Sequence, residues 1–151
     1  MEQTIETDAD DAEFQQLYDY LDGMPEKVKD NVAASMQAIA ELMKGTAVMR
    51  CPVALEEGGR LRGSLESFVE AEPEKITGGV GTSVEYGGFV EFGTGLRGQQ
   101  NPGRYKEPEG IVRNQSWPGM AAQPYLRPAL YDNEVIIRES IATGVIQGVQ
   151  K

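Results

Sequence analysis

Histidine is absent from this sequence of 151 residues, and cysteine occurs once, as Cys51. Without histidine the chain cannot form a Ser-His-Asp triad, a His-Glu-x-x-His zinc site or a histidine-ligated iron centre. A single cysteine gives neither an internal disulfide nor a Cys-x-x-Cys metal site, and we expect a buried, unreactive thiol. Hydrolytic or redox chemistry would depend on carboxylates, lysines or a bound cofactor. The sequence therefore predicts a protein that is not an enzyme and that uses no metal or cofactor.

Long apolar runs are missing as well. Hydrophobic residues make up 40% of the chain and the mean hydropathy is −0.41. No run approaches the roughly 18 apolar residues of a membrane span. Residues 1–11 are acidic, whereas a secretory signal begins with basic residues and continues with apolar ones. We therefore expect a soluble protein that is made in a cytoplasm and does not contact a membrane.

Basic residues are few, and the charge is unevenly distributed. The net charge is −10, and residues 1–30 contribute −8 of it through ten acidic residues against Lys27 and Lys29. Residues 1–11 lack apolar periodicity, so we expect a disordered acidic leader that is solvated or that lines a surface or contacts a partner. This balance argues against a protein that grips duplex DNA, because such affinity comes from lysine and arginine.

Helical periodicity is strongest over residues 12–50 and over residues 124–151. A short amphipathic helix is predicted within residues 12–22, and a longer one runs from Pro25 to just before Cys51 and Pro52. Another long amphipathic helix is expected over residues 124–151. The apolar stripe of the first long helix consists of Val28, Val32, Met36, Ile39, Met43 and Ala47.

Between these helices the pattern changes. Alternation that begins at Leu61 leads into a predicted hairpin of residues 65–71 and 76–83. Residues 96–123 are predicted to form a long Pro/Gly-rich loop in which only Ile111 and Val112 look like a strand. The fold class is therefore α+β: a small antiparallel β-sheet packed against two long amphipathic helices, in a single domain of residues 12–151.

Two motifs are better explained without chemistry. Residues 93–98 match Gly-x-Gly-x-x-Gly, but we expect no helix after them, and a dinucleotide site needs one. Glu56, Glu57, Glu85 and Glu91 could supply a carboxylate pair for glycoside hydrolysis, although isolated acidic residues are usually solvated. The loop is more informative: Tyr105 and Trp117 lie in a basic Pro/Gly-rich segment, a composition typical of surfaces that order against a partner.

Three stretches, taken in order, resemble one family. Cys51, Pro52 and Val53 with residues 60–65 are similar to the pattern aPvdTGrLrxSi. Residues 80–82 and 85–94 are similar to vGt…YAxyvEfGT, and residues 123–130 to qPFlrPAl. Together they resemble the small head–tail joining (neck or tail-completion) proteins of tailed double-stranded-DNA bacteriophages, over about residues 12–149. The chain departs from the pattern at Gly87, which replaces an alanine, and at residues 57–59, which replace Asp-Thr-Gly.

The resemblance implies a structural virion protein at the head–tail junction, assembled in the host cytoplasm as a homo-oligomeric ring. DNA would pass through without sequence-specific binding, and head-closure, connector and tail proteins would be neighbours. Six spheres of this size leave a hole of roughly 40 Å, which favours six copies over twelve. Alternatives are a tail terminator, a capsid-decoration or binding module and, less favoured, a small carboxylate-based enzyme.

Candidate assembly residues come from these motifs and from the loop. We expect Gly93 and Gly95 to require a positive φ or close backbone approach. Glu91 and Arg127 are predicted to form an ion pair that links two motifs, the alternative being two independent surface charges. We also expect the loop to order on assembly. The complete set is Tyr86, Glu91, Phe92, Gly93, Thr94, Arg97, Arg104, Tyr105, Lys106, Arg113, Trp117, Tyr125 and Arg127.

Overall fold

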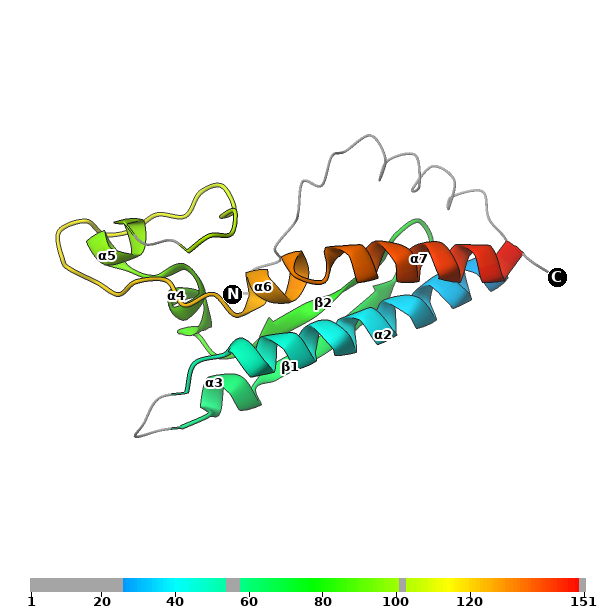
Figure 1. Cartoon of the computed structure of the whole chain (residues 1–151), viewed down its shortest axis with the longest axis horizontal. Helices are drawn as coiled ribbons and strands as arrows, with labels where there is room; N and C mark the ends of the chain where they lie inside the picture. The colour runs from blue at the N-terminus through cyan, green and yellow to red at the C-terminus, as the bar shows by residue number, and fades with distance from the viewer. Residues whose placement is uncertain (1–25, 54–57, 101–102, 150–151) are drawn as a thin grey trace.

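The computed structural model describes residues 26–53, 58–100 and 103–149 (Figure 1). The predicted acidic leader of residues 1–11, the short helix predicted within residues 12–22, and Glu56 and Glu57 lie outside the described residues. No helix within these ranges combines the length and the apolar composition of a membrane span.

The first long helix is confirmed as α2 (Glu26–Arg50). Its buried side chains recur at helical spacing, which explains why the pattern was visible in the sequence. The helix ends where Cys51 donates its backbone N–H to the Ala47 carbonyl, just before Pro52. The buried residues of α2 are Val28, Val32, Ile39, Ala40, Met43 and Ala47.

The predicted hairpin is confirmed as β1 (Leu65–Ala71) and β2 (Ile76–Thr82), paired antiparallel with Leu65 opposite Thr82 and Ala71 opposite Ile76. The alternation expected from Leu61 onward is wrong in its first residues, because Arg60–Gly63 form the short helix α3. The buried Leu61 side chain belongs to this helical turn and joins the core there.

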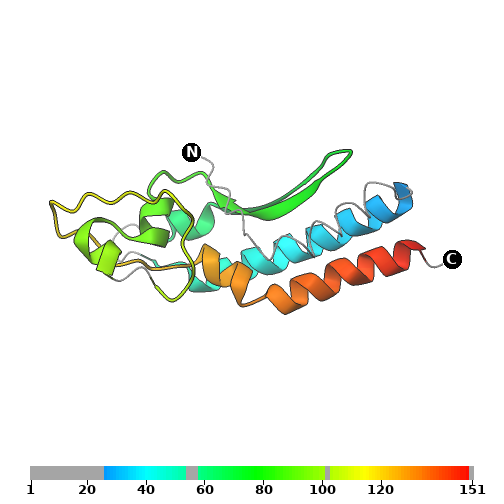
Figure 2. The ribbon, with the colours of Figure 1, turned by 90° about the horizontal axis from the view of Figure 1, so that it is seen from above.

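The elements form layers, with the hairpin on one side of α2 and α7 (Glu134–Val149) on the other (Figure 2). Close approach explains both contacts: Gly78 of β2 lies against Met36, and Gly144 of α7 lies against Ser35. The α+β class is confirmed. The second long helix, α7, lies on the side of α2 opposite the hairpin. The core includes Ile39, Met43, Ala47, Cys51, Leu61, Leu65, Val84, Tyr125 and Ala129.

The expectation of one continuous helix over residues 124–151 is wrong. The chain forms α6 (Leu126–Tyr131) and then α7, and Asn133 causes the break. Its side-chain Nδ2 donates to the Ala129 carbonyl at 2.8 Å and to Thr46 Oγ1 at 3.1 Å. Its backbone N–H bonds to the Leu130 carbonyl, three residues back. The side chain thus takes the acceptor that a continuous helix would use.

Residues 87–92 and the start of the predicted loop are also helical. α4 (Gly87–Phe92) and α5 (Gly95–Gln100) occupy this region, so the expectation that the loop begins at residue 96 is wrong, as is the expectation that no helix opens near residues 93–98. Ile111 and Val112 are not a strand. An isolated bridge instead pairs Thr94 with Met120.

Candidate assembly site

Residues 87–100 and 103–125, which we call the loop lobe, lie beyond the C-terminal end of α2 (Figure 1). The lobe contains α4, α5 and the coil that returns to α6. Its two connections to the helical body are the strand-to-α4 segment and the segment that enters α6. The side chains that fix this arrangement come mainly from α4 and from the start of α6.

The carboxylate of Glu91 is the central anchor of the lobe. Its Oε2 accepts the backbone N–H groups of Tyr125 and Leu126, at 2.7 and 2.8 Å. Its Oε1 accepts the backbone N–H of Arg127 at 3.0 Å and the side-chain Nε of Arg127 at 2.8 Å. Glu91 therefore satisfies the N–H groups that a helix start leaves without partners, and it does so from an element 36 residues away in sequence.

Arg127 completes the anchor. Both side chains of the Glu91–Arg127 pair are buried, with 0% of Arg127 and 1% of Glu91 exposed. The predicted ion pair is confirmed, and the alternative of two independent surface charges is wrong. The guanidinium also donates to the carbonyls of Glu91 and Tyr105, at 2.7 and 3.0 Å, and lies 5.0 Å from the centre of the Phe92 ring. One side chain thus joins α6, α4 and the returning coil.

A backbone clasp closes the lobe around Gly93. Thr94 exchanges N–H···O bonds with Met120, at 2.8 and 2.9 Å. Gly93 has φ 73° and ψ 172°, and a Cβ there would lie 2.6 Å from the Ala122 nitrogen. Gly95 has φ 60°, with the Trp117 carbonyl oxygen 2.6 Å from its would-be Cβ. The expected need for glycine at both positions is confirmed.

Tyr125 and Gly87 fit each other across the core. The buried Tyr125 hydroxyl donates to the Gly87 carbonyl at 3.1 Å. A methyl group on residue 87 would lie 2.9 Å from this hydroxyl oxygen and 2.7 Å from Thr82 Cγ2. The family patterns quoted above have alanine and phenylalanine at these two positions, so the smaller Gly87 makes room for the extra hydroxyl. Burial raises the pKa of the Tyr125 phenol above its ordinary value, and the nearby Glu91 charge adds to this.

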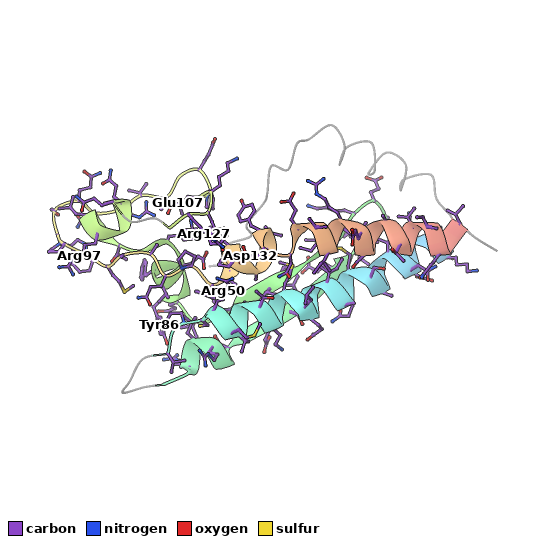
Figure 3. The ribbon with its side chains drawn as sticks, viewed as in Figure 1. Arg50, Tyr86, Arg97, Glu107, Arg127 and Asp132 are labelled. Atoms are coloured by element: carbon purple, nitrogen blue, oxygen red, sulfur yellow. The ribbon has the colours of Figure 1, made fainter. Side chains whose placement is uncertain are left out.

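Two further carboxylates, those of Glu107 and Asp132, hold the returning coil. Arg113 pairs with Glu107 and donates to the Phe92 carbonyl at 2.7 Å. Tyr105 donates to Asp132, at the break between α6 and α7, and its ring stacks on Tyr131 with the centroids 5.9 Å apart. Arg104 and Arg50 reach the same Asp132 carboxylate, at 3.3 and 2.7 Å. Figure 3 shows Arg50 and Asp132 where the end of α2 meets α6, and Glu107 close to Arg127.

The exposed part of the lobe carries apolar and basic side chains together. Trp117 is 51% exposed and Val112 is 92% exposed. Arg97 lies at the outer end of the lobe, away from the long helices (Figure 3). Tryptophan, tyrosine and arginine are enriched where proteins contact one another. Other exposed apolar or basic side chains of the lobe include Phe89, Leu96, Arg104 and Lys106.

The predicted residues therefore separate into two groups. Glu91, Phe92, Gly93, Tyr125 and Arg127 are buried inside the chain, where they position the lobe and do not reach its surface. Those on the surface are Tyr86, Arg97, Arg104, Lys106 and Trp117, with Thr94, Tyr105 and Arg113 between the two groups.

Sequence reasoning did not identify four structural partners in this region. Glu107 and Asp132 bind the loop arginines, and the only signal for Glu107 was an acidic residue within a basic segment. Met120 pairs through its backbone, which no side-chain pattern reveals. Gly119 has φ 65°, and a Cβ there would overlap the Thr94 carbonyl group.

Two sequence motifs were considered for chemistry: the candidate carboxylates, which include Glu91, and the Gly-x-Gly-x-x-Gly match of residues 93–98. Four N–H donors occupy the Glu91 oxygens, so the expectation that the isolated acidic residues are solvated is wrong for Glu91, which is a structural acceptor. Residues 93–98 follow the helix α4 where a dinucleotide site would need a strand.

Burial of Cys51 is confirmed, and desolvation raises the pKa of its thiol. Within the described ranges, no three histidine, cysteine, aspartate or glutamate side chains are placed to hold a metal ion.

A hairpin on a long helix, with an anchored lobe that presents aromatic and basic side chains, defines the α+β architecture of this chain. The chain belongs to the bacteriophage HK97 gp10-like family, described as candidate tail components, whose model matches residues 15–93. The resemblance to phage head–tail joining proteins is thereby confirmed at the level of the family. No curated protein and no solved structure matches the chain.

The matched range ends at Gly93, and the third motif, residues 123–130, lies beyond it. The buried Glu91–Arg127 pair nevertheless joins the matched part of the chain to this motif. The two regions therefore act as one structural unit, although only the first carries the family match.

Proposed function

We propose that the chain is a structural virion protein of the phage neck, forming a homo-oligomeric ring that joins the DNA-filled head to the tail. Membership of a family of phage tail components is the observation that carries this proposal. The ring acts by binding and not by catalysis, and it needs no metal or cofactor. DNA passes through it without base recognition.

The loop lobe is the surface that we assign to contacts with neighbouring virion proteins. Its exposed aromatic and basic side chains lie on a framework fixed by Glu91, Arg127 and the Thr94–Met120 bridge. A framework fixed in advance reduces the entropy that is lost when a neighbour binds. The proposal therefore assigns recognition to residues such as Trp117 and Arg97, and support to the buried anchor.

Ordering of residues 96–123 on assembly stays a prediction. The part of this segment nearest α5 is hydrogen-bonded through Leu96 to the Trp117 carbonyl and through Arg97 to the Pro118 carbonyl. The exposed stretch of residues 109–118, except for Ile111 and Arg113, is the part most available to a neighbour. Limited proteolysis of the free chain tests this point: resistance throughout the segment would contradict it.

The six-fold ring is likewise a proposal. Sphere packing suggested six copies, but the chain is elongated, with the lobe and the long helices end to end (Figure 1). The rotational symmetry of the neck in the particle measures the number of copies in the ring. Heterologous contacts between such subunits close into rings when the rotation permits.

Cryo-electron microscopy of the neck in intact virions tests this function. We expect density for the hairpin, α2 and the loop lobe, repeated around the DNA axis between head and tail. Density for the chain at the far end of the tail, or only on the capsid surface, would contradict the proposal. The second position would indicate a decoration protein.

A further inference from the structure

The hairpin of β1 and β2 has two open edges. The strands pair with each other, and α2 packs on one face of the pair. Figure 2 shows the hairpin as an outer layer, with α2 between it and α7. In a two-stranded sheet, each strand has one edge outside the ladder, where alternate residues point both the N–H and the C=O outward. The fold therefore leaves two rows of backbone groups that the hairpin itself does not use.

The register identifies these groups. Glu72 donates its backbone N–H to the Lys75 carbonyl at 2.7 Å, one step beyond the pair of Ala71 and Ile76. Because hydrogen-bonded and non-hydrogen-bonded pairs alternate along an antiparallel ladder, the Ala71–Ile76 pair and every second pair after it turn their backbone groups outward. Among the described residues, no hydrogen bond reaches these outward groups. The residues that carry them are Ile76, Gly78, Val80 and Thr82 on β2, and Leu65, Ser67, Val69 and Ala71 on β1.

No residue of β2 protects its open edge. The strand Ile76–Thr82 contains neither a charged residue nor a proline, and its register with β1 runs without a bulge. Natural proteins usually protect an open edge with one of these features. An edge without them is suited to pairing with a further strand, in which backbone hydrogen bonds supply the affinity.

The charges of the hairpin indicate which strand fits this edge. Glu66 and Glu70 of β1 are exposed on the face away from α2, because Ser67 between them bonds to Glu41 of α2 on the other face. Two β1 edges side by side would bring these glutamates together, and like charges on neighbouring strands are destabilising. A β1 edge beside the uncharged β2 creates no such repulsion. Both strands have seven residues, so β1 of one copy matches the length of β2 of another.

We propose that β2 of one copy pairs antiparallel with β1 of a neighbouring copy through these outward backbone groups. The contact uses both edges of every copy and can repeat around an axis, as a closed ring requires. Pairing of β2 with β2 would instead stop at two copies and leave both β1 edges open. The choice of β1 rests on the ring of the proposed function. With the strand ends level, Thr77 of one copy lies beside Glu70 of the next on the face away from α2.

Cross-linking between single-cysteine copies tests this contact. Every copy carries Cys51→Ala, together with either Thr77→Cys on β2 or Glu70→Cys on β1. The two versions are supplied, together or separately, to a phage that lacks the gene, and purified virions are treated with a short bis-maleimide. We expect covalent dimers of the chain only when both versions are present. Glu139→Cys on α7, supplied with Thr77→Cys, is the exposed control and should give no dimer.

Each other result of the cross-linking overturns the contact. Dimers with Thr77→Cys alone would indicate pairing between two β2 strands, and adducts with a different virion protein would indicate a foreign strand at this edge. Absence of dimers from the mixed virions would contradict the pairing directly. The position of the chain in the virion is a separate result: mixed dimers away from the neck would contradict the proposed function and leave the strand pairing intact.

A second measurement uses the unmodified chain. Amide hydrogen exchange followed by mass spectrometry compares the isolated chain with the chain in intact virions. The amides of both β1 and β2 should exchange at least about tenfold more slowly in virions, because outward N–H groups that are free in the isolated chain become hydrogen-bonded. The amides of α2, already bonded within the helix, should change less. Slower exchange in β2 alone, or in neither strand, would overturn the proposal.

Discussion

Glu91 and Arg127 form a buried ion pair, Oε1 to Nε at 2.8 Å, in which the carboxylate also accepts three backbone N–H groups at the start of α6. The pair joins a residue at the end of the family-matched segment to one beyond it. Because both charges are desolvated, neither can lose its partner without leaving a buried charge or a buried donor unsatisfied.

We expect Glu91→Gln to lower the free energy of unfolding by about 3–5 kcal/mol, the range for breaking a buried pair. Arg138→Gln, which removes an exposed pair with Glu134, should cost at most about 0.5 kcal/mol. Urea unfolding followed by circular dichroism measures both. Equal, small effects would mean that the buried pair does not anchor the lobe.

Reversal of both charges should not restore stability. An arginine at position 91 cannot accept the N–H groups of Tyr125, Leu126 and Arg127, which the carboxylate now satisfies. We therefore expect the double variant Glu91→Arg/Arg127→Glu to be no more stable than either single variant in the same urea experiment. Full restoration would show that charge pairing alone matters at this site.

Gly93 and Gly45 offer a matched pair of glycine-to-alanine changes. Gly93→Ala should cost at least about 2 kcal/mol, because φ 73° with ψ 172° is a region almost restricted to glycine and the methyl would meet backbone atoms. Gly45→Ala lies in α2 with nothing near its would-be Cβ, and should stabilise the protein by up to about 1 kcal/mol. Thermal unfolding gives both signs, and stabilisation by Gly93→Ala would contradict the clasp geometry.

Gly87 and Tyr125 should be energetically coupled. Gly87→Ala alone is expected to cost about 1–3 kcal/mol, through contacts with the Tyr125 hydroxyl and Thr82. In a Tyr125→Phe background the same change should cost about 1 kcal/mol less, because one of the two close contacts is gone. A double-mutant cycle in urea measures the difference, and strict additivity would argue against the fit described here.

Tyr125 should also make stability depend on pH in alkaline solution. Its folded-state pKa is raised by burial, so the folded protein holds the phenolic proton more tightly than the unfolded chain. This contribution is complete below the unfolded pKa of about 10 and is lost as the pH rises above that value. Tyr125→Phe should reduce the decline in stability above about pH 10. Equal declines in the variant and the parent protein would contradict the assignment.

The elements with regular periodicity could be predicted, and those determined by single contacts could not. α2 and the hairpin follow directly from the spacing of Val28 to Ala47 and from the alternation after Leu65. The break at Asn133 depends on one side-chain hydrogen bond to Ala129, which has no periodic signature. The lobe depends on backbone pairs such as Thr94 with Met120, for which sequence distance gives no register.

The candidate site shows the same division. Matching motifs were enough to predict that Glu91 pairs with Arg127, because each lies within a recognisable pattern. The carboxylate's second role, as acceptor for the start of α6, depends on where Tyr125 and Leu126 place their N–H groups, and this becomes visible only once α4 and α6 are in position.

We propose that the protein joins heads to tails, and electron microscopy of a lysate is the decisive test of this role. The phage would carry a nonsense mutation in the gene for this chain, with complementation by the intact gene as the control. We predict DNA-filled heads beside separate, complete tails, and joined particles after complementation. Intact infectious particles without the protein would contradict the account, as would normal particles retained in unlysed cells.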